Sequence, residues 1–219
     1  AGGKILTVTE GVYKEKTTND SDVFIVRFEK DDFIIDKAMY YGGESSDEVT
    51  QLTVTGAVYS GMVYIGGRTS SKTIPTHKSA YQSSLNLSTG TYSDAYVARF
   101  NKSLDIDDDS FAATYIGGTN REDLFGLDVD ENGNVYIIGE TYGSSSYPTT
   151  DGTSTGRIFI TKFNNKLSGL IASTVVGVNP WTGTEQGRAI IVSDDGIIAS
   201  GQSDFEDTDI ARPFVSKFN

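Results

Sequence analysis

The chain repeats one short pattern four times, and this repetition constrains the fold more than any other feature. Each copy reads aromatic, β-branched, small or β-branched, basic, then Phe, within VFIVRFEK (23–30), AYVARFNK (95–102), IFITKFNN (158–165) and PFVSKFN (213–219). Alternation of this kind is typical of a half-buried strand. Internal repetition at such spacing predicts an array of equivalent units rather than a single irregular domain.

Three further strand-like segments follow each of the first three copies in the same order. They are DKAMYYGG, EVTQLTVTG and MVYIGGRT in the first unit, FAATYIGG, DLFGLDVD and NVYIIGET in the second, and LIASTVVG, GRAIIVSD and GIIASGQS in the third. A unit therefore has four short strands joined by glycine-containing turns. Because one such sheet cannot bury both of its faces alone, stacking of sheets is expected. The sequence predicts an all-β fold, a β-propeller built of four-stranded antiparallel blades.

The best-formed unit resembles a known family. The motifs aromatic-V-A-basic-F, T-Y-I-G-G, D-x-x-G-N-V-Y-I-x-G-x-T and Y-P-T-T over about 93–150 are similar to the SBBP-type (seven-bladed) β-propeller repeat of bacterial and archaeal surface or secreted proteins. The match is degraded over 22–92 and weakest over 157–219. The resemblance implies that the strand ending in V-D is innermost in its blade and the T-Y-I-G-G strand outermost. It carries no general catalytic motif.

With that order of strands in each blade, residues 1–219 form one propeller segment of about three and a half blades. Its repeat units are approximately 22–92, 93–156 and 157–210, with partial units at both ends. Three outer strands come first, then two complete blades, then three inner strands. We expect the segment to belong to a larger propeller, in which its partners are other blades of the same longer chain. A smaller ring closed by strands from both ends, or two chains that meet, are the other arrangements.

Composition narrows the possible functions. The formal net charge of −12 disfavours a nucleic-acid partner. Cys is absent and His77 is the single His, which excludes thiol chemistry and disfavours a multi-His metal site or a Ser-His-Asp triad. No apolar run reaches transmembrane length.

Two acidic stretches could bind calcium or could be plain turns. Asp128-x-Asp130-x-Asn132-Gly133 begins like a calcium-binding loop. However, one aligned turn, within 191–201, keeps two acidic residues, and the other, within 53–67, keeps none. Gly139 also stands where a bidentate Glu is needed, so a hairpin is favoured. The stretch 105–110 is the better cation candidate, with Asp105, Asp107 and Asp109 as the possible calcium ligands. A solvated acidic turn remains the preferred interpretation there, and no cofactor is otherwise expected.

The remaining candidate positions are side chains on strands and loops. Asn19, Asn86 and Asn101 fit the N-glycosylation pattern. The basic residues of the repeated strand are expected to be structural, with Asp22 and Asp94 as plausible partners; they are Arg27, Arg99, Lys162 and Lys217.

A binding or catalytic role would need side chains gathered near the propeller axis. Tyr142, Tyr147 and Trp181 are the only aromatic hints of a ligand-binding rim. Glu48, Asp123 and Glu185 begin equivalent inner strands and could form a carboxylate pair. Because they recur in every unit, a structural use is favoured.

The leading functional hypothesis is a non-enzymatic extracellular or cell-surface scaffold or adhesion module. A glycan- or peptide-binding propeller module is the alternative, with surface proteins or glycans as partners. A propeller-fold glycoside hydrolase or lyase is a weaker third, since propellers host many activities.

Overall fold

A computed structural model of the chain describes residues 20–55, 61–86, 93–143, 146–153, 156–177, 185–204 and 211–218. Thirteen strands and no α-helix occur in these ranges. Every pairing between neighbouring strands is antiparallel. Among the described residues, no helix is long and apolar enough to cross a membrane.

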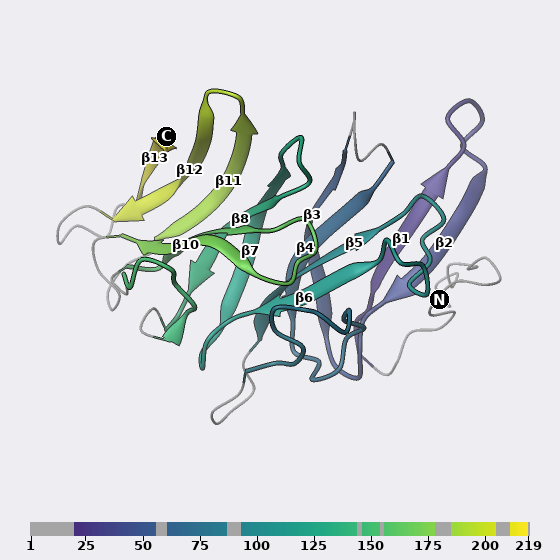
Figure 1. Cartoon of the computed structure of the whole chain (residues 1–219), viewed down its shortest axis with the longest axis horizontal. Coiled ribbons are helices and arrows are strands. Elements are labelled where there is room, and N and C mark those ends of the chain that lie inside the picture. Colours follow the sequence, from purple (N-terminus) through teal and green to yellow (C-terminus); the bar gives the residue numbers. More distant parts are fainter. Residues whose placement is uncertain are drawn as a thin grey trace.

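The strands form two complete four-stranded sheets flanked by two smaller ones (Figure 1). The first sheet pairs β1 (Val23–Phe28) with β2 (Ile35–Tyr41). The second contains β3 (Asp47–Val54), β4 (Val63–Thr69), β5 (Asp94–Phe100) and β6 (Ala112–Ile116). The third contains β7 (Glu122–Val129), β8 (Val135–Thr141), β9 (Ile158–Phe163) and β10 (Leu170–Val176), and the fourth contains β11 (Gln186–Ser193), β12 (Gly196–Asp204) and β13 (Ala211–Phe218).

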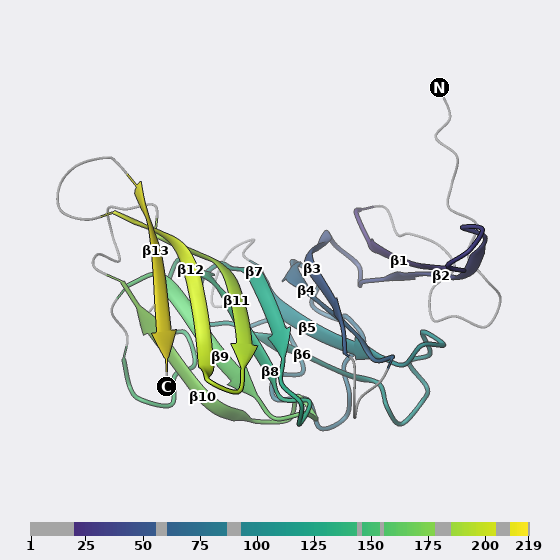
Figure 2. The same cartoon turned by 90° about the horizontal axis from the view of Figure 1, so that it is seen from above.

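The sheets are arranged in chain order and stack face to face (Figure 2). The first strand of each complete sheet packs against the next sheet, so that β3 contacts β7 and β7 contacts β11. Strand β1 is equivalent to β5, β9 and β13, which are the third strands of their blades. The first sheet, β1 and β2, therefore consists of the third and fourth strands of a blade. The predicted blade phase is therefore present in the described strands.

Each interface between sheets has its own apolar cluster. Alternate residues of β5 face opposite ways: Tyr96 and Ala98 pack toward β1 and β2, whereas Ala95 and Val97 pack toward β7. The third cluster joins β8 and β9 to Ile190 of β11. This two-sided burial is what a stacked sheet requires, and it explains why β5, β6 and β8 are buried along their whole length.

A β-bulge recurs at the same place in all three inner strands. The register shifts between Val49 and Gln51 in β3, between Leu124 and Gly126 in β7, and between Gly187 and Ala189 in β11. The extra residue of the first bulge, Thr50, donates its hydroxyl proton to the Leu124 carbonyl oxygen at 2.5 Å. The bulge thus connects one sheet directly to the next.

The turns that leave the third strand also follow one pattern. Phe33, Leu104 and Leu167 all have a positive φ near 55°, a conformation that costs energy for a residue with a side chain. In the complete blades this leucine is buried in an apolar cluster. The Asn at the start of the turn accepts hydrogen bonds from the backbone, at 2.8 Å from Ser103 N to Asn101 Oδ1 and 3.0 Å from Ser168 N to Asn164 Oδ1. Burial of the leucine side chain and the hydrogen bonds to the Asn side chain together stabilise this strained backbone conformation.

Candidate functional site: a charged cleft at the start of the inner strands

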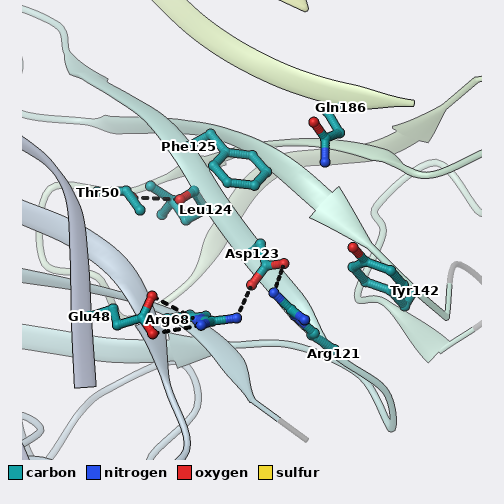
Figure 3. Close-up of a pocket in the computed structure, with 9 residues that line it drawn as sticks. All are labelled: Glu48, Thr50, Arg68, Arg121, Asp123, Leu124, Phe125, Tyr142 and Gln186. Carbon is teal, nitrogen blue, oxygen red and sulfur yellow. Dashed lines mark hydrogen bonds and ion pairs between the residues drawn. The ribbon is translucent and has the colours of Figure 1, made fainter. Parts of the chain in front are cut away.

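A cleft of about 220 Å³ opens where β3 and β7 begin, between their sheets (Figure 3). Its lining comes from five different strands or their ends, all near the predicted axis of the propeller. The lining residues are Glu48, Thr50, Arg68, Arg121, Asp123, Leu124, Phe125, Tyr142 and Gln186.

Charged side chains of alternating sign run across this cleft (Figure 3). Arg68 donates to both carboxylate oxygens of Glu48, at 2.6 and 3.1 Å, and reaches Asp123 at 3.4 Å. Asp123 receives a second guanidinium at 2.8 Å from Arg121. The hydrogen bond to Glu48 and the charge of Asp123 raise the pKa of Arg68 above its usual value. The charges of the cleft are therefore neutralised internally.

The aromatic ring of Tyr142 is covered by guanidinium groups. Arg157 lies 4.3 Å and Arg121 5.3 Å from the ring centroid, which is cation–π distance. Arg157 also pairs with Glu140, whose carboxylate accepts a further hydrogen bond from Gln186 at 2.9 Å. Burial raises the pKa of Glu140, although Gln186 and Arg157 oppose that shift. Tyr142 is 45% exposed, but its ring is engaged within the chain.

Two of the three strand-initial carboxylates predicted from the sequence line the cleft. Glu48 and Asp123 are separated by Arg68, which binds both. Glu185 is fully buried instead, with Oε2 against Gly177. The structure therefore does not present a pair of free carboxylates at this point.

The predicted hairpin at 128–136 is confirmed. Strands β7 and β8 pair antiparallel across it, and Gly133 has a φ of 77°. Asp130 accepts backbone hydrogen bonds at 3.0 Å from Asn132 and 2.8 Å from Asn134, and its other oxygen accepts the Tyr136 hydroxyl at 3.1 Å. The acidic residue therefore serves the turn itself.

The calcium candidates at 105–109 lie in the turn between β5 and β6. Asp105 accepts the backbone N–H of Asp107 at 2.9 Å, and Asp108 accepts that of Ser110 at 2.7 Å, so both make turns of the Asx type. Hydrogen bonds from Ser110 lower the pKa of Asp108. Across the ranges that the structure describes, no three Asp, Glu, His or Cys side chains converge to hold a metal. Binding of calcium by Asp105, Asp107 and Asp109 stays a prediction.

The glycosylation candidates differ in their surroundings. Asn86 is exposed, and its backbone N–H donates to Asp94 at 3.0 Å. Asn101 is half-buried and uses its side-chain oxygen to cap the following turn. Asn19 lies outside the described residues. Their modification stays a prediction.

The aromatic rim is only partly formed by the predicted residues. Tyr147 is 4% exposed and stacks on Phe159 with a centroid distance of 4.7 Å, so it belongs to the core and not to a rim. Tyr147 is the Tyr of the Y-P-T-T motif, and its hydroxyl group also forms a hydrogen bond of 2.9 Å with the Thr161 hydroxyl group. Trp181 lies outside the described residues.

The basic residues of the repeated strand are structural where the structure describes them. Arg99 donates to the backbone carbonyl oxygens of Ser110 and Asn165, and Arg27 pairs with Asp36. Lys162 lies over the Tyr136 ring at 4.8 Å. The side chain of Lys217 lies outside the described part.

The prediction that Asp94 is a partner of the repeated basic residues is wrong in the described part of the chain. Asp94 accepts hydrogen bonds from Gln82 and Asn86 instead. It points toward the neighbouring blade, as described below.

Sequence reasoning missed the arginines that organise the cleft. Arg68 stands near the end of β4, Arg157 directly precedes β9, and Arg121 directly precedes the inner strand β7. One signal was available for two of them, since Arg121 neighbours Glu122 in the sequence and Arg68 stands opposite Glu48 in the β3–β4 ladder.

The fold and its repeated inter-sheet contacts define a protein of the β-propeller repeat class. The model of the SBBP family, described as a β-propeller repeat, matches residues 113–147. The chain therefore carries an SBBP repeat, and the resemblance inferred from the sequence is confirmed over this stretch. No curated protein matches the chain.

The matched repeat does not coincide with one sheet. It covers most of β6, then β7 and β8, and ends at Tyr147, so it joins the outermost strand of one blade to the inner pair of the next. The cleft residues Arg121, Asp123 and Tyr142 fall within it.

Proposed function

We propose that the chain is a non-enzymatic scaffold segment of a β-propeller, in an extracellular or cell-surface protein with a structural or adhesive role. The SBBP repeat and the strongly acidic composition support this assignment. One observation carries the non-enzymatic part. The charged side chains at the cleft, where a propeller would hold a ligand or catalytic pair, bind one another.

Catalysis of glycoside cleavage needs two carboxyl groups that face one bond with different protonation states. In this cleft Arg68 lies between Glu48 and Asp123 and pairs with both. A scaffold has no such requirement, and a network of ion pairs at the rim of the inner strands fixes the relative position of neighbouring blades.

The test of location uses antibodies raised against the purified 219-residue chain. Intact cells that carry the gene should be labelled, and brief external protease treatment should remove the label. Labelling that needs permeabilised cells would contradict the proposal. Adhesion is tested separately with beads coated with the chain, compared with beads coated with an unrelated acidic protein.

A binding module is the second candidate, and the cleft itself favours it. Its mixed charges could receive a peptide with both acidic and basic groups, if the ligand replaced the internal ion pairs. An array of glycans and charged peptides should then give saturable binding that is lost in Arg121→Ala. Equal binding by Arg121→Ala and the unchanged chain would place the ligand elsewhere.

A further inference from the structure

Two carboxyl groups from neighbouring blades meet in the interior. Asp94 begins β5 in one sheet, Glu122 begins β7 in the next, and both are 0% exposed. Asp94 Oδ1 and Glu122 Oε2 each lie 2.5 Å from the position that a Cβ on Gly117 would occupy. The two oxygens are therefore separated by at most twice that distance. Only a glycine leaves room for them at this position.

The hydrogen bonds around the pair leave one oxygen without a partner. Glu122 accepts from the Thr141 hydroxyl at 2.7 Å and from the Gly118 N–H at 3.0 Å. Asp94 Oδ2 accepts from Gln82 at 2.6 Å and from the Asn86 N–H at 3.0 Å. Asp94 Oδ1 is buried and accepts none. A single proton held between the two carboxyl groups would supply the missing hydrogen bond.

The surrounding charges do not neutralise the pair. Arg68 and Arg121 make their ion pairs with Asp123, and no ion pair in the described part of the chain includes Asp94 or Glu122. The negative charge of Asp123 also acts on Glu122. Two buried, ionised carboxylates at this distance would repel each other strongly.

The tyrosines near the pair carry no compensating charge. Burial raises the pKa of Tyr115 and of Tyr147 well above the usual value, so both hydroxyl groups are neutral. Among the described residues no basic side chain forms an ion pair with either carboxyl group, so a proton shared by the two would relieve the repulsion.

We propose that Asp94 and Glu122 share one proton at neutral pH and form a pH-sensitive clasp between adjacent blades. Burial is the largest cause that raises the pKa of Glu122 to about 8 and that of Asp94 to about 6, in agreement with one retained proton. Because the groups are coupled, these values describe the pair rather than either residue. The inference concerns the junction between blades and does not depend on what the propeller binds.

The repeats provide comparisons within the chain. Asp22 Oδ1 and Asp47 Oδ2 lie 2.4 and 2.5 Å from the Cβ position of Gly42, so the first junction also brings two carboxylates together. Burial raises the pKa of Asp47. In the next unit Arg157 stands where Asp94 stands, and Glu185 alone approaches the equivalent glycine, Gly177.

The clasp has a defined effect on stability. A carboxyl group with a raised folded-state pKa stabilises the fold most below its unfolded pKa, and the contribution is lost as pH rises through the folded value. Between pH 6 and 8 the folded chain holds a proton that the unfolded chain does not. The folding equilibrium constant should fall by up to about ten-fold per pH unit in this window because of the pair.

The experiment measures urea unfolding of the 219-residue chain from pH 5 to pH 9, with Glu122→Gln as the variant. The amide keeps the shape and cannot ionise, so the variant should lose the decline between pH 6 and 8. It should approach or exceed the stability of the unchanged chain above pH 8. Glu185→Gln is the matched control at the equivalent strand start, and it should keep the decline. A decline retained in Glu122→Gln, or removed equally by both variants, overturns the proposal.

A second measurement keeps the proposal testable if Glu122→Gln does not fold. Carbon-13 resonances of the Asp and Glu carboxyl groups in the unchanged chain should include one group that loses its proton only above pH 6. Full ionisation of every carboxyl group by pH 5.5 overturns the shared proton. Addition of calcium alone at pH 7 should leave the same resonance in place; its displacement would mean that a cation, not a proton, neutralises the pair.

Discussion

Leu127 and Leu52 occupy the same position of the inner strand in neighbouring blades, yet their environments differ. Leu127 pairs with Ile137 and is 6% exposed, whereas Leu52 pairs with Ile65 and is 56% exposed. The first faces the preceding complete sheet, where its Cδ1 lies 3.0 Å from the Cβ position of Gly66. Stacking of sheets is therefore the only large difference between the two positions.

Replacement of each leucine by alanine isolates that stacking. Leu127→Ala should lower the free energy of unfolding by about 3 kcal/mol, within the range of about 2 to 5 for a buried leucine that leaves a cavity. Leu52→Ala removes a side chain that is about half in water and leaves no cavity, so about 0.5–1 kcal/mol is expected. The loss of strand propensity is common to both variants and cancels in the comparison.

Urea unfolding followed by far-ultraviolet circular dichroism gives both values, with the slope of the transition as a check that the unfolded state is unchanged. Sedimentation at the same protein concentration ensures that no association covers Leu52. Equal losses in the two variants would refute the idea that face-to-face packing of sheets, rather than pairing within a sheet, provides the stability of this position.

Three more outcomes are expected. Gly139→Ala should cost about 2–4 kcal/mol, because its Cβ would lie 2.1 Å from the Asp123 carbonyl oxygen, while Gly169→Ala, with its nearest atom at 3.4 Å, should cost under about 1 kcal/mol; thermal unfolding compares them. Asp130→Ala should destabilise the chain by about 2 kcal/mol, equally with calcium and with EDTA, as the hairpin interpretation requires; a loss seen only with calcium would contradict it. Arg99→Lys should cost about 1–3 kcal/mol, since an ammonium group cannot reach both carbonyl oxygens that the guanidinium binds, and an unchanged denaturation midpoint would disprove that role.

The strands were predictable because each carries its own period-two signal. The aromatic-to-Phe segments became β1, β5, β9 and β13, and the hairpin with Asn132-Gly133 formed where its turn residues required it. These features depend on neighbours in sequence. Repetition gave the order of the strands within a unit, and the resemblance to the SBBP repeat implied which strand of a blade is innermost.

The contacts between blades were not predictable in the same way. The partner of Asp94 is Glu122, 28 positions away in the next sheet, and only the stacked arrangement brings them together. The arginines of the cleft were missed for the same reason, because Arg68 binds Asp123 across a sheet boundary. The repeated spacing of a motif predicts a strand, but it does not predict which side chain of the next sheet that strand will contact.

The offset of the SBBP repeat from the sheets bears on how such arrays can grow. A genetic duplication of 112–163, which extends the matched stretch to include β9, would add an outermost strand that finishes an existing sheet, along with the three inner strands that start a new one. Each inserted copy would carry its own glycine turn and the acidic residue that binds it. Because the repeat boundary lies between strands of one sheet, recombination could lengthen the array without a change in the sequences of the terminal units.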